Sequence, residues 1–223
     1  METHTYLMDA AAMGDAATVR FLLEHGADPN IASVQCGLTA LLAAAMNRNA
    51  AIVELLLAHG ADAYAVMRHY NYSTALEWAV GNVDADVARV LMKAGVPPSF
   101  HRFGFSMGRD AAARDVVRVL VEHGADINEV DDWGRTPVMQ AAEYAEVETV
   151  RAMIALGADV NRVSEPNMNG RNGHETALSL ARAKKRADVV AELRQHGARE
   201  GEWTSGGVGP LLTRLWDIVT GRD

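Results

Sequence analysis

Disulfides and membrane-spanning segments are both missing from this sequence of 223 residues. Cys36 is the only cysteine, so no disulfide can form within the chain, which is typical of a protein from a reducing compartment. No apolar run approaches the ~18–20 residues that cross a bilayer. The first fifteen residues, METHTYLMDAAAMGD, lack the basic and apolar regions of a secretory signal. We therefore expect a cytoplasmic protein that enters no membrane.

Basic residues are also scarce. The chain has 21 Lys and Arg against 29 Asp and Glu, a formal net charge of −8. Nucleic acids and anionic membranes bind basic surfaces, and the sequence offers only the short run Lys184-Lys185-Arg186. This predicts that neither nucleic acid nor a membrane is a partner. A hydrophobic content of 49% nevertheless predicts a substantial core.

Catalytic signatures are the third absence. The stretch TSGGVGP, residues 204–210, is rich in glycine but lacks the Lys-Ser/Thr pair of a phosphate-binding loop. Cys36 belongs to no motif that pairs it with a histidine. We therefore predict no catalytic residue, metal or cofactor. One alternative stays open, which is a ligand- or metal-dependent enzyme built around His69, His101, Arg102 and Asp110.

A repeat is what the sequence does contain. A threonine is followed by a glycine 21 residues later in five places, and Phe103 takes the place of threonine in a sixth. The pairs are Thr5/Gly26, Thr39/Gly60, Thr74/Gly95, Phe103/Gly124, Thr136/Gly157 and Thr176/Gly197. Self-similarity at this period predicts a stack of short structural units.

Each unit has the pattern of two amphipathic helices. An apolar residue follows the threonine by two positions and a small residue by five, as in Leu41 and Ala44, which places both on one helix face. A second apolar stripe with helical spacing comes before the glycine, as in Val53, Leu56 and Leu57. Threonine can cap the first helix, and glycine can end the second in a left-handed conformation. Such a hairpin is too small to bury its own apolar face, so the units must stack.

The stretch DDWGRTPVMQAAEYAEVETVRAMIALGADVN, residues 131–161, resembles the ankyrin repeat. The resemblance implies an all-α solenoid of helix-turn-helix units, with a β-hairpin-like finger between each glycine and the next threonine. The solenoid is expected to fill residues 1–200, and residues 201–223 are expected to form a Gly-rich linker and a short amphipathic helix. The expected repeats are about 2–30, 31–64, 65–98, 99–127, 128–161 and 162–200.

The motif HGAD, which occurs at residues 25–28, 59–62 and 123–126, could suggest a row of metal sites. Stacked helices lie ~8–10 Å apart, so histidines of neighbouring repeats cannot share a metal at ~2 Å. A histidine in the last helical turn interacts favourably with the helix dipole. We therefore interpret HGAD as a structural turn.

The resemblance also implies a non-catalytic module that binds another protein through its finger tips and the concave face of its first helices, as an adaptor or an inhibitor. A self-assembling structural spacer is the other alternative. The positions that vary in the family, together with the enrichment of Tyr, Trp, Phe and Arg typical of binding hot spots, select Met46, Asn47, Tyr70, Asn71, Phe100, Arg102, Asp110, Asp132, Trp133, Arg135, Glu143 and Tyr144.

Three segments depart from the repeat frame. The connection KAGVPPSFHRFGFSMGRD, residues 93–110, is shortened, whereas NRVSEPNMNGRNGHET, residues 161–176, is lengthened and predicted to form an extended finger. Residues 211–219 carry an amphipathic pattern that predicts either a cap on the sixth repeat or a helix that binds a partner or associates with itself. Glu192 and Arg194 favour the second reading, because they predict that the sixth repeat already presents a polar outer face.

Overall fold

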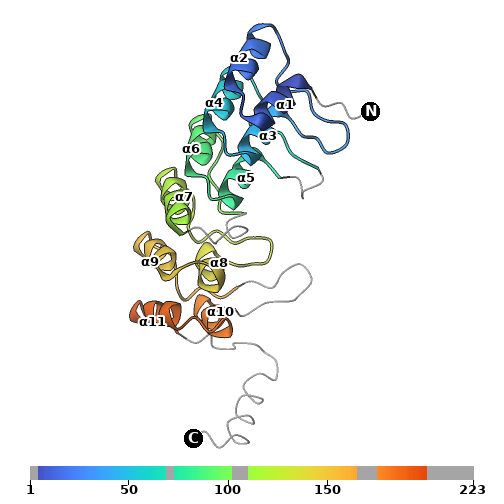
Figure 1. Cartoon of the computed structure of the whole chain (residues 1–223). Coiled ribbons are helices and arrows are strands. Elements are labelled where there is room, and N and C mark those ends of the chain that lie inside the picture. The colour runs from blue at the N-terminus through green and yellow to red at the C-terminus, as the bar shows by residue number, and fades with distance from the viewer. Residues whose placement is uncertain (1–4, 69–72, 102–109, 165–174, 200–223) are drawn as a thin grey trace, which may run out of the picture.

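The computed structural model describes residues 5–68, 73–101, 110–164 and 175–199, and these residues form eleven α-helices and no strand beyond one isolated β-bridge (Figure 1). The helices are α1 Tyr6–Met13, α2 Ala16–Glu24, α3 Ala40–Met46, α4 Ala50–Ala58, α5 Ala75–Gly81, α6 Ala85–Lys93, α7 Asp110–Glu122, α8 Pro137–Tyr144, α9 Val147–Ala155, α10 Ala177–Ala183 and α11 Ala187–Gln195. The prediction of an all-α protein is confirmed.

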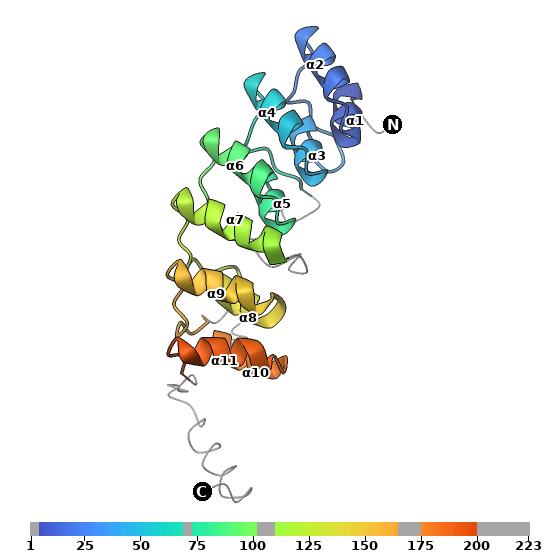
Figure 2. The same cartoon turned by 60° about the vertical axis from the view of Figure 1, so that its left-hand side comes forward.

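The helices form two parallel rows that run the length of the molecule (Figures 1 and 2). The second helices contact one another in the order α2, α4, α6, α7, α9 and α11, while α1, α3 and α5 form one part of the first row and α8 and α10 the other. The frame positions that predicted close packing are buried, since Leu41, Ala44, Val138 and Ala141 are each at most 1% exposed. The core therefore lies between the rows and between successive hairpins.

Threonine caps the first helix of a repeat in four of the five places where the sequence predicts it. The hydroxyls of Thr5, Thr39, Thr74 and Thr176 accept a hydrogen bond from the backbone N–H three residues later. Thr136 is the exception and corrects the prediction. There the N–H of Met139 donates to the Thr136 carbonyl at 3.0 Å, which leaves the buried hydroxyl without a partner.

The second helices end as the glycine predicts. In all six units the glycine has a φ between +80° and +96°. Its N–H and that of the next residue donate to carbonyls of the last turn, as Gly60 N–H does to Leu57 and Ala61 N–H to Leu56, which is the Schellman motif. In HGAD the Nδ1 of each histidine lies 2.7–2.9 Å from the carbonyl four residues before it. The structural interpretation of HGAD is confirmed.

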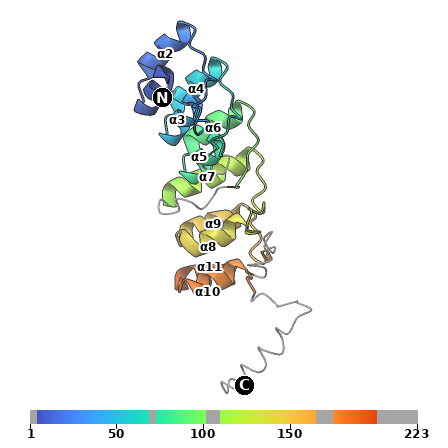
Figure 3. The same cartoon turned by 90° about the vertical axis from the view of Figure 1, so that its right-hand side faces the viewer.

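The fingers project from one side of the helical stack (Figure 3). Backbone hydrogen bonds close the base of four fingers, from Ser33 to Leu38, Met67 to Ser73, Asp131 to Arg135 and Ser164 to Glu175. Neighbouring fingers also bond, because the Arg68 N–H donates to the Cys36 carbonyl at 2.7 Å. The predicted extended part of the fifth-to-sixth finger, residues 165–174, lies outside the described residues.

Side chains link the turn of one repeat to the turn of the next. Asn128 donates to the Gly157 carbonyl and accepts from the Asp159 N–H, and Asn30 and Asn161 make the same pair of bonds at their junctions. Tyr64 takes this place in the second repeat and donates to the Gly95 carbonyl. Each repeat is thereby held to its neighbour by polar contacts as well as by packing.

The fourth repeat departs from the predicted frame. Its second helix, α7, begins at Asp110, four residues earlier than the spacing predicts, so Asp110 starts a second helix instead of ending a first one. Residues 102–109, which include Phe105 and Gly108 of the predicted first helix, lie outside the described residues.

The structure also corrects the prediction made for Glu192 of the sixth repeat. Glu192 is not part of a polar outer face, because it is buried and pairs with Arg151 of the fifth repeat at 2.7 Å. Arg194 is exposed as predicted.

Candidate partner-binding groove

The finger of the fifth repeat presents an exposed tryptophan. Asp131, which is buried, accepts hydrogen bonds from the backbone N–H groups of Trp133 at 2.9 Å and Arg135 at 2.8 Å. These bonds fix the tight turn that carries Trp133, whose side chain is 44% exposed. The turn is therefore held rigid while its aromatic side chain faces solvent.

A network of ion pairs links this finger to α8 and to the sixth repeat. Glu143, on α8, lies 2.9 Å from Arg135 and 3.1 Å from Lys184, while Arg135 reaches Glu175 of the sixth repeat at 2.7 Å. The Glu143 side chain is 8% exposed and that of Arg135 is 20% exposed. The network spans two repeats and orders the side chains of the surface that the sequence predicts to be the binding groove.

Tyr144 completes the network at the end of α8. Its ring is 55% exposed, and the Lys184 ammonium lies 5.2 Å from the ring centroid, a cation–π distance. Burial alone would raise the pKa of Glu143, but hydrogen bonds from Tyr144 and Lys184 and the charge of Arg135 outweigh it and lower that pKa. The hydrogen bond to Glu143 raises the pKa of Tyr144 and of Lys184. The ion pairs are therefore charged at neutral pH.

Two members of this network, Glu175 and Lys184, are not among the predicted site residues. They hold the same places in the sixth repeat that Arg135 and Tyr144 hold in the fifth. Arg135 and Glu175 carry opposite charges at equivalent positions of adjacent repeats, and this is the sequence signal that could have selected Glu175.

The other predicted site residues do not form a single cluster. Met46 is half-buried at the end of α3, and Asn47 caps that helix, with its amide donating to the Ala43 carbonyl. Asp132 is exposed and lies 3.3 Å from the His101 ring nitrogen. Tyr70, Asn71 and Arg102 lie outside the described residues.

Phe100 corrects the prediction, because it is 2% exposed and belongs to the core. The shortened connection turns it inward, and its backbone N–H donates to Glu129 at 2.9 Å. Phe100 cannot contact a partner without leaving the core.

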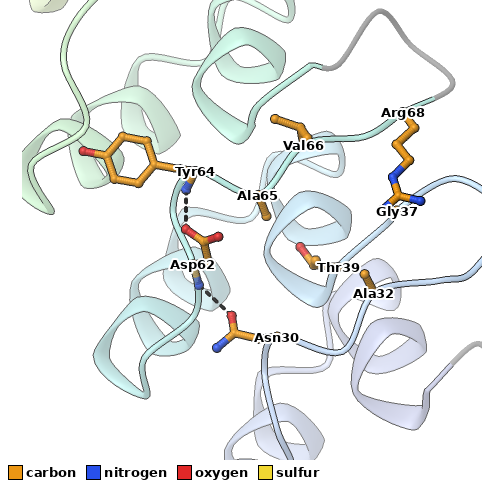
Figure 4. Close-up of a pocket in the computed structure, with 9 residues that line it drawn as sticks. All are labelled: Asn30, Ala32, Gly37, Thr39, Asp62, Tyr64, Ala65, Val66 and Arg68. Carbon is orange, nitrogen blue, oxygen red and sulfur yellow. Dashed lines mark hydrogen bonds between the residues drawn. The ribbon is translucent and has the colours of Figure 1, made fainter.

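A second hollow lies between the first two fingers (Figure 4). It has a volume of about 300 Å³ and is lined by Asn30, Ala32, Gly37, Thr39, Asp62, Tyr64, Ala65, Val66 and Arg68. Many of its polar groups already bond to the protein, since Asn30 accepts from the Asp62 N–H at 2.7 Å and Asp62 from the Tyr64 N–H at 2.9 Å. The hollow is therefore a weaker candidate than the groove of repeats five and six.

The described residues do not form a metal or catalytic centre of the kind that the enzyme alternative requires. His101 pairs with Asp132, and within the described residues no three His, Cys, Asp or Glu side chains converge as metal ligands would. His69 and Arg102 lie outside the described residues. In the same part of the chain, no helix has the length and apolarity that a membrane crossing requires.

The structure is a solenoid of stacked helical hairpins with projecting fingers. Exposed aromatic side chains of its fifth repeat lie next to a network of ion pairs, which is typical of repeat proteins that bind other proteins. A family model described as ankyrin repeats (3 copies) matches residues 7–100 and again 109–202. The chain belongs to the ankyrin-repeat family, whose repeats are protein-interaction modules.

Solved structures show the same fold. A chain from the complex of the predatory endopeptidase Bd0816 from Bdellovibrio bacteriovorus with the immunity protein Bd3460 is 27% identical, with a TM-score of 0.67 over 86% of this chain and 98% of the other. The ankyrin repeat domain of Bcl-3, a member of the IkappaB protein family, is 25% identical, with a TM-score of 0.68 over 89% of each chain. No curated protein sequence matches this chain.

Proposed function

We propose that this protein is a non-catalytic binding module that holds a protein partner in the groove of repeats five and six. The observation that carries the proposal is the pair of exposed aromatic side chains, Trp133 and Tyr144, beside the ion-pair network of Arg135, Glu143 and Lys184. Exposed aromatics on a rigid surface are typical binding hot spots, because little side-chain entropy is lost on binding.

The partner that we propose is an enzyme, which the module inhibits by covering it. The similarity to a chain from a complex of an endopeptidase with an immunity protein supports this choice over a simple adaptor. The acidic charge of −8 favours a partner with a basic surface, since complementary charge accelerates association.

The test is a pull-down from the native host with the intact chain and with the double variant Trp133→Ala/Tyr144→Ala, followed by affinity measurement with the purified partner. We expect at least about a 30-fold loss of affinity, because two hot-spot side chains are removed. The control is Ile31→Ala/Val34→Ala, which removes two exposed hydrophobic side chains from the first finger and is expected to leave the affinity unchanged. A partner that binds the groove variant as tightly as the intact chain would place the binding surface elsewhere.

Inhibition is tested separately with the captured partner. If that partner is an enzyme, its turnover is expected to fall as the intact chain is added and to recover with the groove variant. If the captured partner keeps full activity in the complex, the protein is an adaptor and not an inhibitor. The groove would then still be the binding site.

A further inference from the structure

The first repeat exposes positions that are buried or half-buried in the later repeats that the structure describes. The residues at these positions, Tyr6, Asp9, Thr18, Phe21 and Leu22, are here called the first-repeat face. Tyr6 is 85% exposed, whereas Ala40 and Ala75, which hold the same frame position, are at most 1% exposed. Thr18 is exposed where Ile52 and Val87 are fully buried.

The first-repeat face is also more apolar than a solvent-facing end repeat requires. Phe21 is 58% exposed and stacks on His25 with ring centroids 4.0 Å apart, and Met13, the last residue of α1, is 84% exposed. End repeats of a solenoid carry polar outer faces when water covers them. A face with two large aromatic side chains is therefore suited to a partner.

The other end of the described stack is different. In α10 and α11 no large hydrophobic side chain is exposed, and the solvent-facing residues include Arg182, Lys185, Arg194 and Gln195. This end offers no apolar surface to the sequence that follows it. That sequence nevertheless contains a strongly apolar segment at residues 210–219, PLLTRLWDIV, with Leu211, Leu212, Leu215, Trp216, Ile218 and Val219.

The reach of the chain decides which copy of the first-repeat face this segment can cover. The described chain ends at Arg199, next to α11, at the opposite end from α1 and α2 (Figure 1). The residues from Arg199 to Leu211 span at most about 40 Å when fully extended. Five steps between stacked repeats, at roughly 8–10 Å each, already need about 40–50 Å before the outer side of the first repeat is reached. The segment of one molecule therefore cannot cover the face of the same molecule.

We propose that residues 210–219 bind the first-repeat face of a second copy of this chain, so that copies associate head to tail. The two surfaces differ, so the contact is heterologous, and each added copy brings a new free face and a new free segment. The assembly therefore grows as an open chain instead of stopping at a dimer. It leaves the groove of repeats five and six open, so it is independent of the proposed partner binding.

Two full-length variants and one control test the proposal. The face variant is Tyr6→Glu/Phe21→Glu, and the segment variant is Leu215→Glu/Trp216→Glu. The control is Val34→Glu/Val163→Glu, which places the same charges at exposed hydrophobic positions off the face. Circular dichroism and thermal melts establish that each variant folds, and sedimentation equilibrium over a wide concentration range measures its mass.

We expect the intact chain and the control to form oligomers whose mass increases with concentration, and each of the two variants alone to stay at the 24.0 kDa of one chain. An equimolar mixture of the two variants is expected to form a complex of twice that mass and nothing larger, because one supplies the segment and the other the face. The proposal is wrong if the intact chain is monomeric throughout, or if the mixture does not pair. It is also wrong if either variant alone still associates, since the contact would then join two like surfaces.

Discussion

At the scale of single residues, Thr136 and Thr176 show that the same residue at the same frame position can have opposite energetic roles. Both are at most 1% exposed, but Thr176 caps α10 while the Thr136 hydroxyl has no hydrogen-bond partner. We expect Thr176→Val to lower the free energy of unfolding by about 1 kcal/mol. Thr136→Val is expected to leave it unchanged or to raise it, since a buried unpaired hydroxyl is replaced by a methyl group. Urea denaturation of both variants measures the difference, and equal losses would contradict it.

Glu143 makes the stability of the fifth and sixth repeats depend on acid. Its pKa is lowered from an ordinary value of 4.5, so its stabilising contribution is complete above that pH and is lost as the pH falls through the folded-state pKa. We expect Glu143→Gln to reduce the free energy of unfolding by about 1–2 kcal/mol at pH 7, because Arg135 and Lys184 lose their partner. The gap between variant and parent should narrow below about pH 4.5.

Denaturation series from pH 7 to pH 3 measure this narrowing. Glu54→Gln is the control, because Glu54 is the same type of residue but is exposed on α4. A gap for Glu143→Gln that stays constant to pH 3 would show that the ion pairs do not stabilise the fold.

The sequence correctly predicted which side chains are exposed in a finger of normal length, but not which way a side chain points in a shortened connection. Trp133 and Tyr144 are exposed where the frame placed them, but Phe100, selected by the same reasoning, is buried. The difference arises because Trp133 lies in a finger of normal length closed by Asp131, whereas Phe100 lies in a shortened connection whose path depends on Glu129, a residue far along the chain. Contacts between distant residues of this kind are not encoded in a local pattern.

At the scale of elements, the frame predicted the helix ends and missed one helix start. The Thr-to-Gly spacing fixed where the second helices stop, since a left-handed glycine is required there whatever the neighbouring repeat does. The start of α7 one turn early was not predictable, because the second helices of the first three repeats start after a capping Asp or Asn, and Ala113 stands at that place in the fourth repeat. The ends of a helix could therefore be predicted from the sequence wherever a capping residue was present.

Fingers pack closely enough that one added methyl group should separate two of them. Gly37 has a φ of +76°, and a Cβ there would lie 2.9 Å from the Val66 carbonyl oxygen, whereas a Cβ at Gly60, with a φ of +83°, would meet nothing within 4 Å. We expect Gly60→Ala to cost about 1–2 kcal/mol through backbone strain alone. Gly37→Ala should cost more, because the Arg68-to-Cys36 hydrogen bond between the fingers must also lengthen. Urea denaturation compares the two, and a smaller loss for Gly37→Ala would mean that the fingers are not in close contact.

At the scale of the whole molecule, one kind of polar link recurs from turn to turn along the stack, and the third junction uses a different one. Asn30, Tyr64, Asn128 and Asn161 each reach forward to the glycine carbonyl of the next turn. Ser99 stands at this place in the third repeat and instead donates to Glu129, which also accepts from the Phe100 N–H. Among the described residues, Glu129 and the His101–Asp132 pair are therefore polar contacts that join the turns of the third and fourth repeats.

Because a repeat protein is stabilised by contacts between nearest neighbours, weakening one junction should divide its unfolding at that point. We expect Glu129→Ala to make helices α1–α6 and helices α8–α11 lose hydrogen-exchange protection at different urea concentrations, whereas in the intact chain they lose it together. Asn161→Ala is the matched control at the last junction, where it should release α10 and α11 alone. Mass spectrometry of peptides from α6, α9 and α11 distinguishes these patterns. If Glu129→Ala lowers protection equally in all three peptides, the apolar packing along α6, α7 and α9 couples the two halves, and Glu129 is only a local contact.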